Sequence, residues 1–188
     1  MRIKETNKNL LFPMPVLLIA TYNEDGTVNV MNAAWGTMVD SDLILLELTK
    51  DHKTSENILR EKAFTISYAT IDHIKEADYF GIVSGNEVKD KFLKSGLTSK
   101  ESTVVHAPII QEYPVCLECS LYKVVETEDE FAIYGKISSI DVDDKYLDEK
   151  GRLDFDKCGF VTYNSFDQSY RVVGKKASSA FRIGLELK

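Results

Sequence analysis

The chain has few of the residues that mark cross-linked, linker-rich or secreted proteins. It contains three cysteines, four prolines and ten glycines in 188 residues. Three cysteines cannot form the disulfide framework of a small secreted domain, and the sequence has no low-complexity tract or proline-rich linker. Residues 1–9 are polar and lack the apolar core of a signal peptide. No apolar run approaches the ~18 residues needed to cross a bilayer. These absences predict a cytoplasmic protein without a membrane span.

The acidic balance of the chain excludes a further class of partner. The formal net charge is -7, with 44% hydrophobic and 28% charged residues. An acidic surface argues against nucleic acid or an anionic membrane as the main partner. The length and the hydrophobic content fit one globular domain over residues 1–188 with a sizeable core.

Most of the apolar segments have the length and composition of β-strands. We expect strands at residues 15–22, 27–31, 43–49, 63–69, 115–126, 130–142, 160–163 and 169–173. Helices are expected at residues 54–61, 71–83 and 87–94. The two strands of about a dozen residues exceed the usual ~5–6, and long curved strands suit a barrel. The pattern therefore predicts a mainly β protein, an antiparallel barrel with short helical insertions, although an α+β sandwich is an alternative.

The segment from Asn29 to Gly36 is the most informative in the chain. Asn32, Ala33, Ala34, Trp35 and Gly36 are expected to form an irregular connection between two strands. Small residues beside the sole tryptophan let the backbone approach a planar ligand and offer it N–H and C=O groups. The alternative is that Trp35 is an ordinary core aromatic.

A second informative segment follows the strand that ends near residue 49. Lys50 and Lys53 lie at the start of a short expected helix, which Thr54 can cap. The first turn of a helix has free N–H groups and a partial positive charge, which favour a phosphate. The alternative is a capped helix whose charged start is solvated. A phosphate site so close to a flat platform indicates a mononucleotide ligand.

Taken together, these segments resemble the flavin reductase-like family with an FMN-binding split barrel, and within it the flavoredoxin-like group. The resemblance runs from about residue 13 to residue 174. It is carried by residues 15–19, 29–36, 53–54 with 57–58, 77–85, 90–92 and 170–174. One departure is Asn32, where flavoredoxin-like sequences often have threonine.

The resemblance implies a homodimer with one FMN per subunit. By analogy, Asn32 to Trp35 would lie along the isoalloxazine and ribityl groups, and Asn29 would contact the ribityl or the phosphate. Lys50, Lys53, Thr54 and Lys91 would hold the phosphate. The alternatives are a solvated helix position for Lys91 and a solvent-facing strand position for Asn29.

The resemblance also implies the chemistry. Because FMN itself carries the electron transfer, no catalytic acid or base is strictly required, and the sequence identifies no catalytic residue. The leading hypothesis is an NAD(P)H-dependent flavin oxidoreductase; NADH or NADPH would bind without a Gly-x-Gly-x-x-Gly fingerprint. The alternatives are an electron carrier reduced by a redox partner protein, and a non-catalytic barrel that stores or senses flavin.

The sequence also contains Cys116-Leu117-Glu118-Cys119, which has the spacing of some metal and redox sites. These cysteines lie in an expected strand, where residues three apart point to opposite faces. We therefore expect a structural role for them and no metal site.

Overall fold

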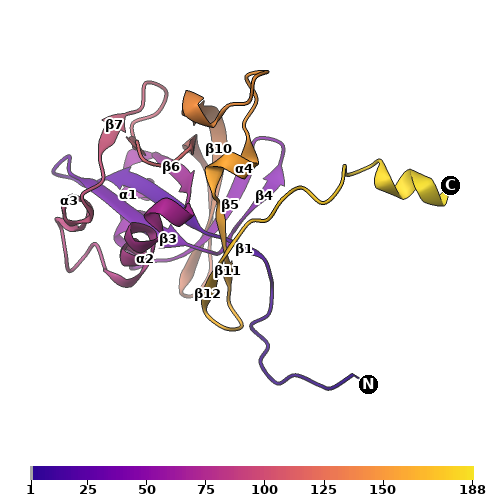
Figure 1. The fold of residues 1–188 in the computed structure, drawn as a ribbon. Coiled ribbons are helices and arrows are strands. Elements are labelled where there is room, and N and C mark those ends of the chain that lie inside the picture. Colours follow the sequence, from indigo (N-terminus) through magenta and orange to yellow (C-terminus); the bar gives the residue numbers. More distant parts are fainter. Residues whose placement is uncertain (1) are drawn as a thin grey trace.

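An antiparallel β-barrel is the centre of the computed structural model, which describes residues 2–188 (Figure 1). The strands are β1 (Met14–Pro15), β2 (Leu17–Tyr22), β3 (Val28–Ala33), β4 (Gly36–Asp40), β5 (Leu43–Thr49), β6 (Ala63–Tyr68), β7 (Ser99–Glu101), β8 (Pro108–Ile110), β9 (Val115–Glu126), β10 (Glu130–Val142), β11 (Val161–Asn164) and β12 (Ser169–Val172). The helices are α1 (Lys53–Glu61), α2 (Ile74–Ile82), α3 (Lys91–Ser95) and α4 (Phe155–Cys158), with 3₁₀ turns η1 (Ile71–His73), η2 (Asp144–Tyr146) and η3 (Ile183–Leu187). This is the mainly β split barrel with short helices that the sequence predicts.

Seven strands form the main sheet, in the order β3-β2-β6-β9-β10-β5-β4. Its two end strands, β3 and β4, are consecutive in the chain and are joined by Ala34 and Trp35 alone. At Gly36, a Cβ atom would lie 2.6 Å from Leu17 Cδ1 and 2.9 Å from Leu46 Cδ2. Side chains of β2 and β5 therefore meet at this glycine, and the sheet curls so that its two ends lie together.

The long hairpin of β9 and β10 supplies much of the curvature. Its pairing shifts register between Tyr134 and Gly135 and again between Ile137 and Ser139. Such bulges bend a strand and increase its twist. A Cβ atom at Gly135 would overlap the ring of Phe64 at Cζ, so the glycine lets β10 pass close to the core.

The strand β2 is buried on both faces, as its continuous apolar sequence predicts. Leu17 and Ile19 pack inside the barrel. Leu18 and Ala20 point the other way, into a second cluster that includes Phe80 of α2. This second cluster fixes α2 against the outside of β3, where α2 forms one side of the candidate site.

The last two expected strands are present but lie outside the main sheet. β11 and β12 form a separate three-stranded sheet with the short β1. The end strands of the main sheet, β3 and β4, are joined through Ala34 and Trp35, and neither of them pairs with β11 or β12. The small sheet instead brings residues of β11 and β12 to the candidate site.

Three local predictions also need correction. The irregular connection expected over residues 32–36 is shorter, because Asn32 and Ala33 belong to β3 and Gly36 begins β4. The helix expected at residues 87–94 is α3 alone, at 91–95. Thr54 does not cap α1: the N-cap is His52, without a side-chain cap, and the hydroxyl of Thr54 instead accepts a hydrogen bond from Asn29.

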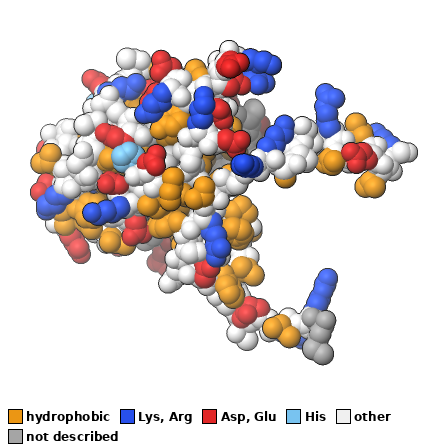
Figure 2. Space-filling view, in the orientation of Figure 1, with side chains coloured by type: hydrophobic (Ala, Val, Ile, Leu, Met, Phe, Trp, Pro, Cys, Tyr) orange, Lys and Arg blue, Asp and Glu red, His pale blue; other side chains and the backbone are white. Residues whose placement is uncertain are grey.

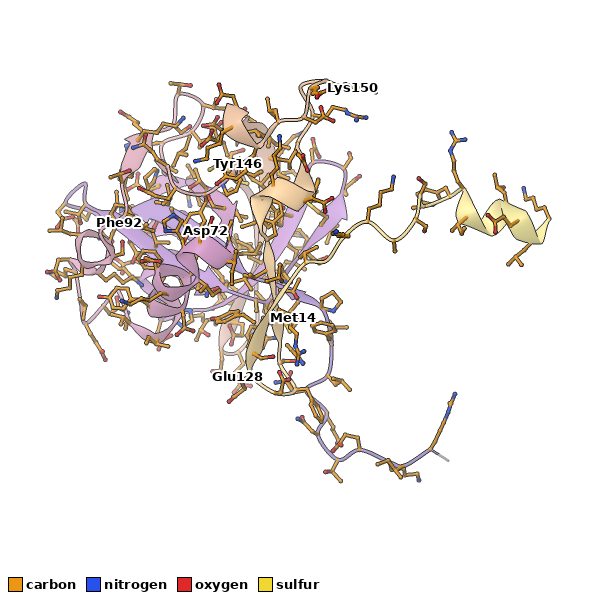
Figure 3. The ribbon with its side chains drawn as sticks, viewed as in Figure 1. Met14, Asp72, Phe92, Glu128, Tyr146 and Lys150 are labelled. Carbon is orange, nitrogen blue, oxygen red and sulfur yellow. The ribbon has the colours of Figure 1, made fainter. Side chains whose placement is uncertain are left out.

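Two terminal arms extend away from the body of the molecule (Figure 1). We call residues 2–12 the N-terminal arm and residues 174–188 the C-terminal arm. Side chains along both arms point outward into solvent (Figure 3). Among residues 2–188, no helix is both long enough and apolar enough to span a membrane.

Candidate functional site

Two adjacent cavities lie where α1, α2 and the small sheet meet the barrel. The wide cavity has a volume of about 770 Å³, and the narrow cavity has a volume of about 340 Å³. They share the lining residues Met31, Asn32, His52, Gly81 and Ile82. The two cavities therefore offer one elongated site with two ends of different chemistry.

The start of α1 forms one wall of the narrow cavity. The strand β5 ends at Thr49, and α1 begins at Lys53 after a turn of three residues, with Lys53 and Thr54 lining the cavity. The first backbone hydrogen bond of the helix is donated by the N–H of Glu56 to the carbonyl of His52. The N–H groups before Glu56 thus have no partner within the helix, and this end carries a partial positive charge.

Lys91 lies in the narrow cavity as a buried cation. Its exposed fraction is only 2%. Its ammonium donates to the carbonyl of Val83 at 3.0 Å, and no carboxylate within 4.0 Å pairs with it among residues 2–188. Burial lowers the pKa of Lys91 to about 8. A buried ammonium with one neutral acceptor has donors left for an anion, so the alternative of a solvated helix lysine is wrong.

Asn29 and the loop after α2 complete the narrow cavity. Asn29 is buried, and its Nδ2 donates to Thr54 Oγ1 at 2.8 Å, so it does not face solvent. A Cβ atom at Gly85 would lie 2.5 Å from Asn29 Oδ1. Asn86 Nδ2 donates to the carbonyl of Asp51 at 2.7 Å, which ties this loop to the turn before α1. Residues 84–86 lie between two expected helices, and the glycine at position 85 is the sequence signal of this close approach.

The two lysines predicted beside α1 lie in different places. Lys53 lines the narrow cavity, with its Nζ 2.9 Å from both carboxylate oxygens of Glu56. Lys50 Nζ is 2.6 Å from Glu126 Oε1, and Lys50 lines neither cavity. Its backbone N–H donates to the carbonyl of Asp129, which binds this residue to the acidic tip of the β9–β10 hairpin. The structure therefore does not bring Lys50 to the other predicted ligands.

The junction of β3 and β4 forms one wall of the wide cavity. Ala33, Ala34 and Trp35 all line it. Trp35 is 56% exposed, so the alternative of a core aromatic is wrong. Asn32 Nδ2 donates to the carbonyl of Ala77 at 2.9 Å, which fixes this wall against α2.

The small sheet adds residues that the sequence analysis did not identify as site residues. Tyr163 and Tyr170 line the wide cavity, and the hydroxyl of Tyr170 donates to Asp78 Oδ1 at 2.8 Å. Burial is the larger cause and this hydrogen bond the second cause that raise the pKa of Tyr170 to about 12. The hydroxyl therefore keeps its proton at neutral pH. The segments around Asp78 and Tyr170 belong to those that carry the family resemblance, but no local pattern indicates that two segments so far apart in sequence meet.

Charge separates the two cavities. The wide cavity is lined by the carboxylates of Glu47, Asp78 and Glu130, and none of its described lining residues is Lys or Arg. The tip of the β9–β10 hairpin, marked by Glu128 in Figure 3, brings Glu130 to this cavity. The wide end can accept a flat aromatic group, and the narrow end has the cations and helix N–H groups that an anionic tail requires.

The cysteines of the Cys-x-x-Cys segment lie apart from this site. Cys119 packs in the barrel core, whereas Cys116 lines a different cavity on the far side of β9. Burial raises the pKa of Cys116 to about 12, and it also raises that of Cys119. Within residues 2–188, no three His, Cys, Asp or Glu side chains are grouped as metal ligands.

Comparisons with known proteins relate the chain to one family and its fold. A family model described as the flavin reductase like domain matches residues 9–164. The flavoredoxin of Desulfovibrio vulgaris (Miyazaki F) superposes with a TM-score of 0.92 and 32% identity, covering 98% of this chain and 100% of that chain. The flavoredoxin from Methanosarcina acetivorans gives a TM-score of 0.89 and 28% identity, with 100% of both chains covered. An uncharacterized protein of Archaeoglobus fulgidus is 30% identical over 162 residues, which is 85% of this chain and 88% of that protein.

Proposed function

Because the chain belongs to the flavin reductase-like family, we propose that it is an FMN-binding oxidoreductase that accepts electrons from NADH or NADPH. The observation that supports FMN most directly is Lys91, a buried ammonium beside the free N–H groups of α1. Riboflavin lacks a phosphate, so its binding does not require a buried cation beyond the ribityl chain. FMN has a phosphate at that end, and the phosphate would satisfy the unused donors of Lys91.

The residues of the site fit this cofactor. Lys91, Lys53, Thr54 and the backbone of α1 would hold the phosphate, and Asn29 would contact the phosphate or the ribityl. Asn32, Ala33, Ala34 and Trp35 would lie along the ring. FMN, when bound, supplies the electron-transfer chemistry. The protein binds and orients it, and Tyr170 keeps a proton in place beside the carboxylate of Asp78.

A second candidate is an electron carrier that a partner protein reduces. The carboxylates of Glu47, Asp78 and Glu130 at the wide cavity, without a lining Lys or Arg, support it. A negative rim repels the phosphates of a nicotinamide dinucleotide and attracts a basic partner surface. The similarity to a flavoredoxin over nearly the whole chain supports the same candidate. For either candidate, we propose a single domain over residues 1–188 that works as a homodimer.

Titration of the purified protein tests the cofactor. FMN and riboflavin are added to flavin-free protein, and binding is followed by flavin fluorescence. Because charge-assisted hydrogen bonds contribute ~1.5–3 kcal/mol, we expect FMN to bind at least about tenfold more tightly. Equal affinity for the two ligands would remove the phosphate site from the proposal.

Anaerobic reduction then separates the two electron donors. Loss of the oxidised flavin absorbance is followed after NADH or NADPH is added to the FMN-loaded protein. Rapid bleaching by either one supports the oxidoreductase. Reduction by a basic redox protein, together with slow bleaching by both nicotinamides, supports the carrier.

A further inference from the structure

We propose that the C-terminal arm of one copy of the chain seats on the mouth of the wide cavity of a second copy, and so adds residues to its site. The inference rests on the proposed function only in taking that cavity as the flavin site. It goes beyond a homodimer because it names the segment that reaches across and the surface that receives it.

The first observation is the shape of the arm. Its backbone leaves β12 and extends away from the body (Figure 1). Phe181 is 99% exposed and Leu187 is 94% exposed, with Ile183 and Leu185 also exposed in the η3 turn. Large apolar side chains gathered on one short segment are costly in water and mark an interaction surface.

The second observation is the separation of charge between the arms and the body. The C-terminal arm carries four Lys or Arg residues and one Glu, and the N-terminal arm carries three and one. The intervening residues 13–173 carry 16 basic and 28 acidic side chains, a net charge of -12. Two such bodies repel one another, and a basic apolar arm from each copy offsets that repulsion.

The mouth of the wide cavity offers the complementary surface. Its carboxylates are Glu47, Asp78 and Glu130, and Trp35 and Ile82 at the same cavity are exposed apolar side chains. Figure 2 shows further hydrophobic side chains near the roots of the two arms. Seven residues lie between Val173 and Phe181, and the eight steps that join the two can span about 26–29 Å when extended. In a two-fold dimer the contact forms twice, since each arm meets the other copy.

Photo-crosslinking tests where the arm lies. The photoreactive residue p-benzoylphenylalanine replaces Phe181 in the full-length, flavin-free protein, which is mixed with isotope-labelled chains that lack it. We expect a product of twice the chain mass, with the cross-link to labelled peptides from residues 31–36, 78–83 or 163–170. The control places the same residue at Tyr122, an exposed position on β9 outside the arms. Cross-links only within one chain, only to another face, or absent altogether would overturn the proposal.

Charge reversal tests the complementarity independently. Lys175→Glu, Lys176→Glu and Arg182→Glu are combined in one chain, and the dissociation constant of the dimer is measured by sedimentation. We expect it to rise by about tenfold or more. The matched control reverses Lys136, Lys145 and Lys150, which lie on the body away from the wide cavity, and should change it less than about threefold. Equal effects of the two triple variants would count against a seated arm.

These readouts require no bound flavin. If the arm cross-links as expected but the protein binds no FMN, the proposed function fails and the arm contact stands. If FMN binds tightly but the arm does not reach the second copy, the arm contact fails and the proposed function stands.

Discussion

The two ends of the site are built in opposite ways. The narrow cavity is made by backbone and cations: the start of α1, the glycine loop after α2 and the ammonium of Lys91. The wide cavity is made by side chains of small, aromatic and acidic residues from β3, β5, α2 and the small sheet. The narrow end can thus recognise a charge of fixed sign, while the wide end can surround a flat ring. Changes at the narrow end should act on the phosphate alone, and changes at the wide end should act on any ligand with the ring.

Replacement of Lys91 should give the largest separation of the two ends. Lys91→Met removes the buried charge and keeps an apolar chain of similar length. We expect FMN affinity to fall by about 1.5–3 kcal/mol, roughly 10- to 150-fold, with riboflavin affinity unchanged. Paired fluorescence titrations measure both. Lys94→Met, on the exposed face of the same helix, is the control. A parallel loss of riboflavin affinity would show that Lys91 supports the whole site.

The pH dependence of FMN binding should show a somewhat smaller effect. The pKa of Lys91 in the flavin-free protein is lowered to about 8 by burial, and only its charged form attracts a phosphate. FMN affinity should therefore fall about tenfold between pH 7 and pH 9, while riboflavin affinity stays level. In Lys91→Met the fall should disappear.

The same pKa shift fixes the sign of a stability effect. Because the folded pKa of Lys91 lies below the unfolded value, the unfolded chain binds more protons between about pH 8 and pH 10.5. The contribution of Lys91 to the free energy of unfolding therefore rises with pH across that window. Denaturant titrations of the flavin-free wild type and Lys91→Met measure this contribution as their difference.

A change at the wide end should affect both ligands alike. Tyr170→Phe removes the hydrogen bond to Asp78 and keeps the aromatic ring. We expect FMN and riboflavin affinities to change together, each by about 1 kcal/mol or roughly fivefold, with a shift in the flavin absorbance. A loss confined to FMN would contradict the assignment of the ring to the wide cavity.

The smallest effect should come from Lys50. Its ammonium pairs with Glu126 and lines neither cavity, and exposed ion pairs contribute ~0–1 kcal/mol. Lys50→Ala should leave FMN affinity within about twofold. Lys53→Ala, its neighbour at the start of α1, should weaken FMN by more than that. Equal losses in the two variants would place Lys50 at the phosphate after all.

The contrast between the two cavities explains which parts of the fold and the site could be predicted from the sequence. The narrow end was predictable in large part, since the strand, the following Lys and Thr residues and the start of α1 are local features. Lys50 was misplaced because its partner Glu126 lies 76 residues away, on a hairpin tip whose position no local pattern gives. Six of the seven strands of the main sheet were predicted from their apolar runs, whereas β4, whose residues 37–40 are exposed, was not. The separate sheet of β11 and β12 was not predicted either, because strand length does not tell which edge a strand will join.

The wide cavity was harder to predict, because its residues come from distant parts of the sequence. Asp78 and Tyr170 are 92 residues apart, and each is unremarkable where it stands in the sequence. Trp35 drew attention only because it is the sole tryptophan in the chain. Its exposure and its place at the joint between β3 and β4 follow from how the sheet curls.

That joint has a mechanical consequence. Ala34 and Trp35 are the short hinge across which the first and last strands of a seven-stranded sheet are held together. A ring lying on this hinge would contact both end strands of the sheet, β3 and β4, and would hold those two edges together. Occupancy of the site should therefore slow amide exchange in strands as distant as β6 and β9, because any opening that passes through the hinge must first release the ligand.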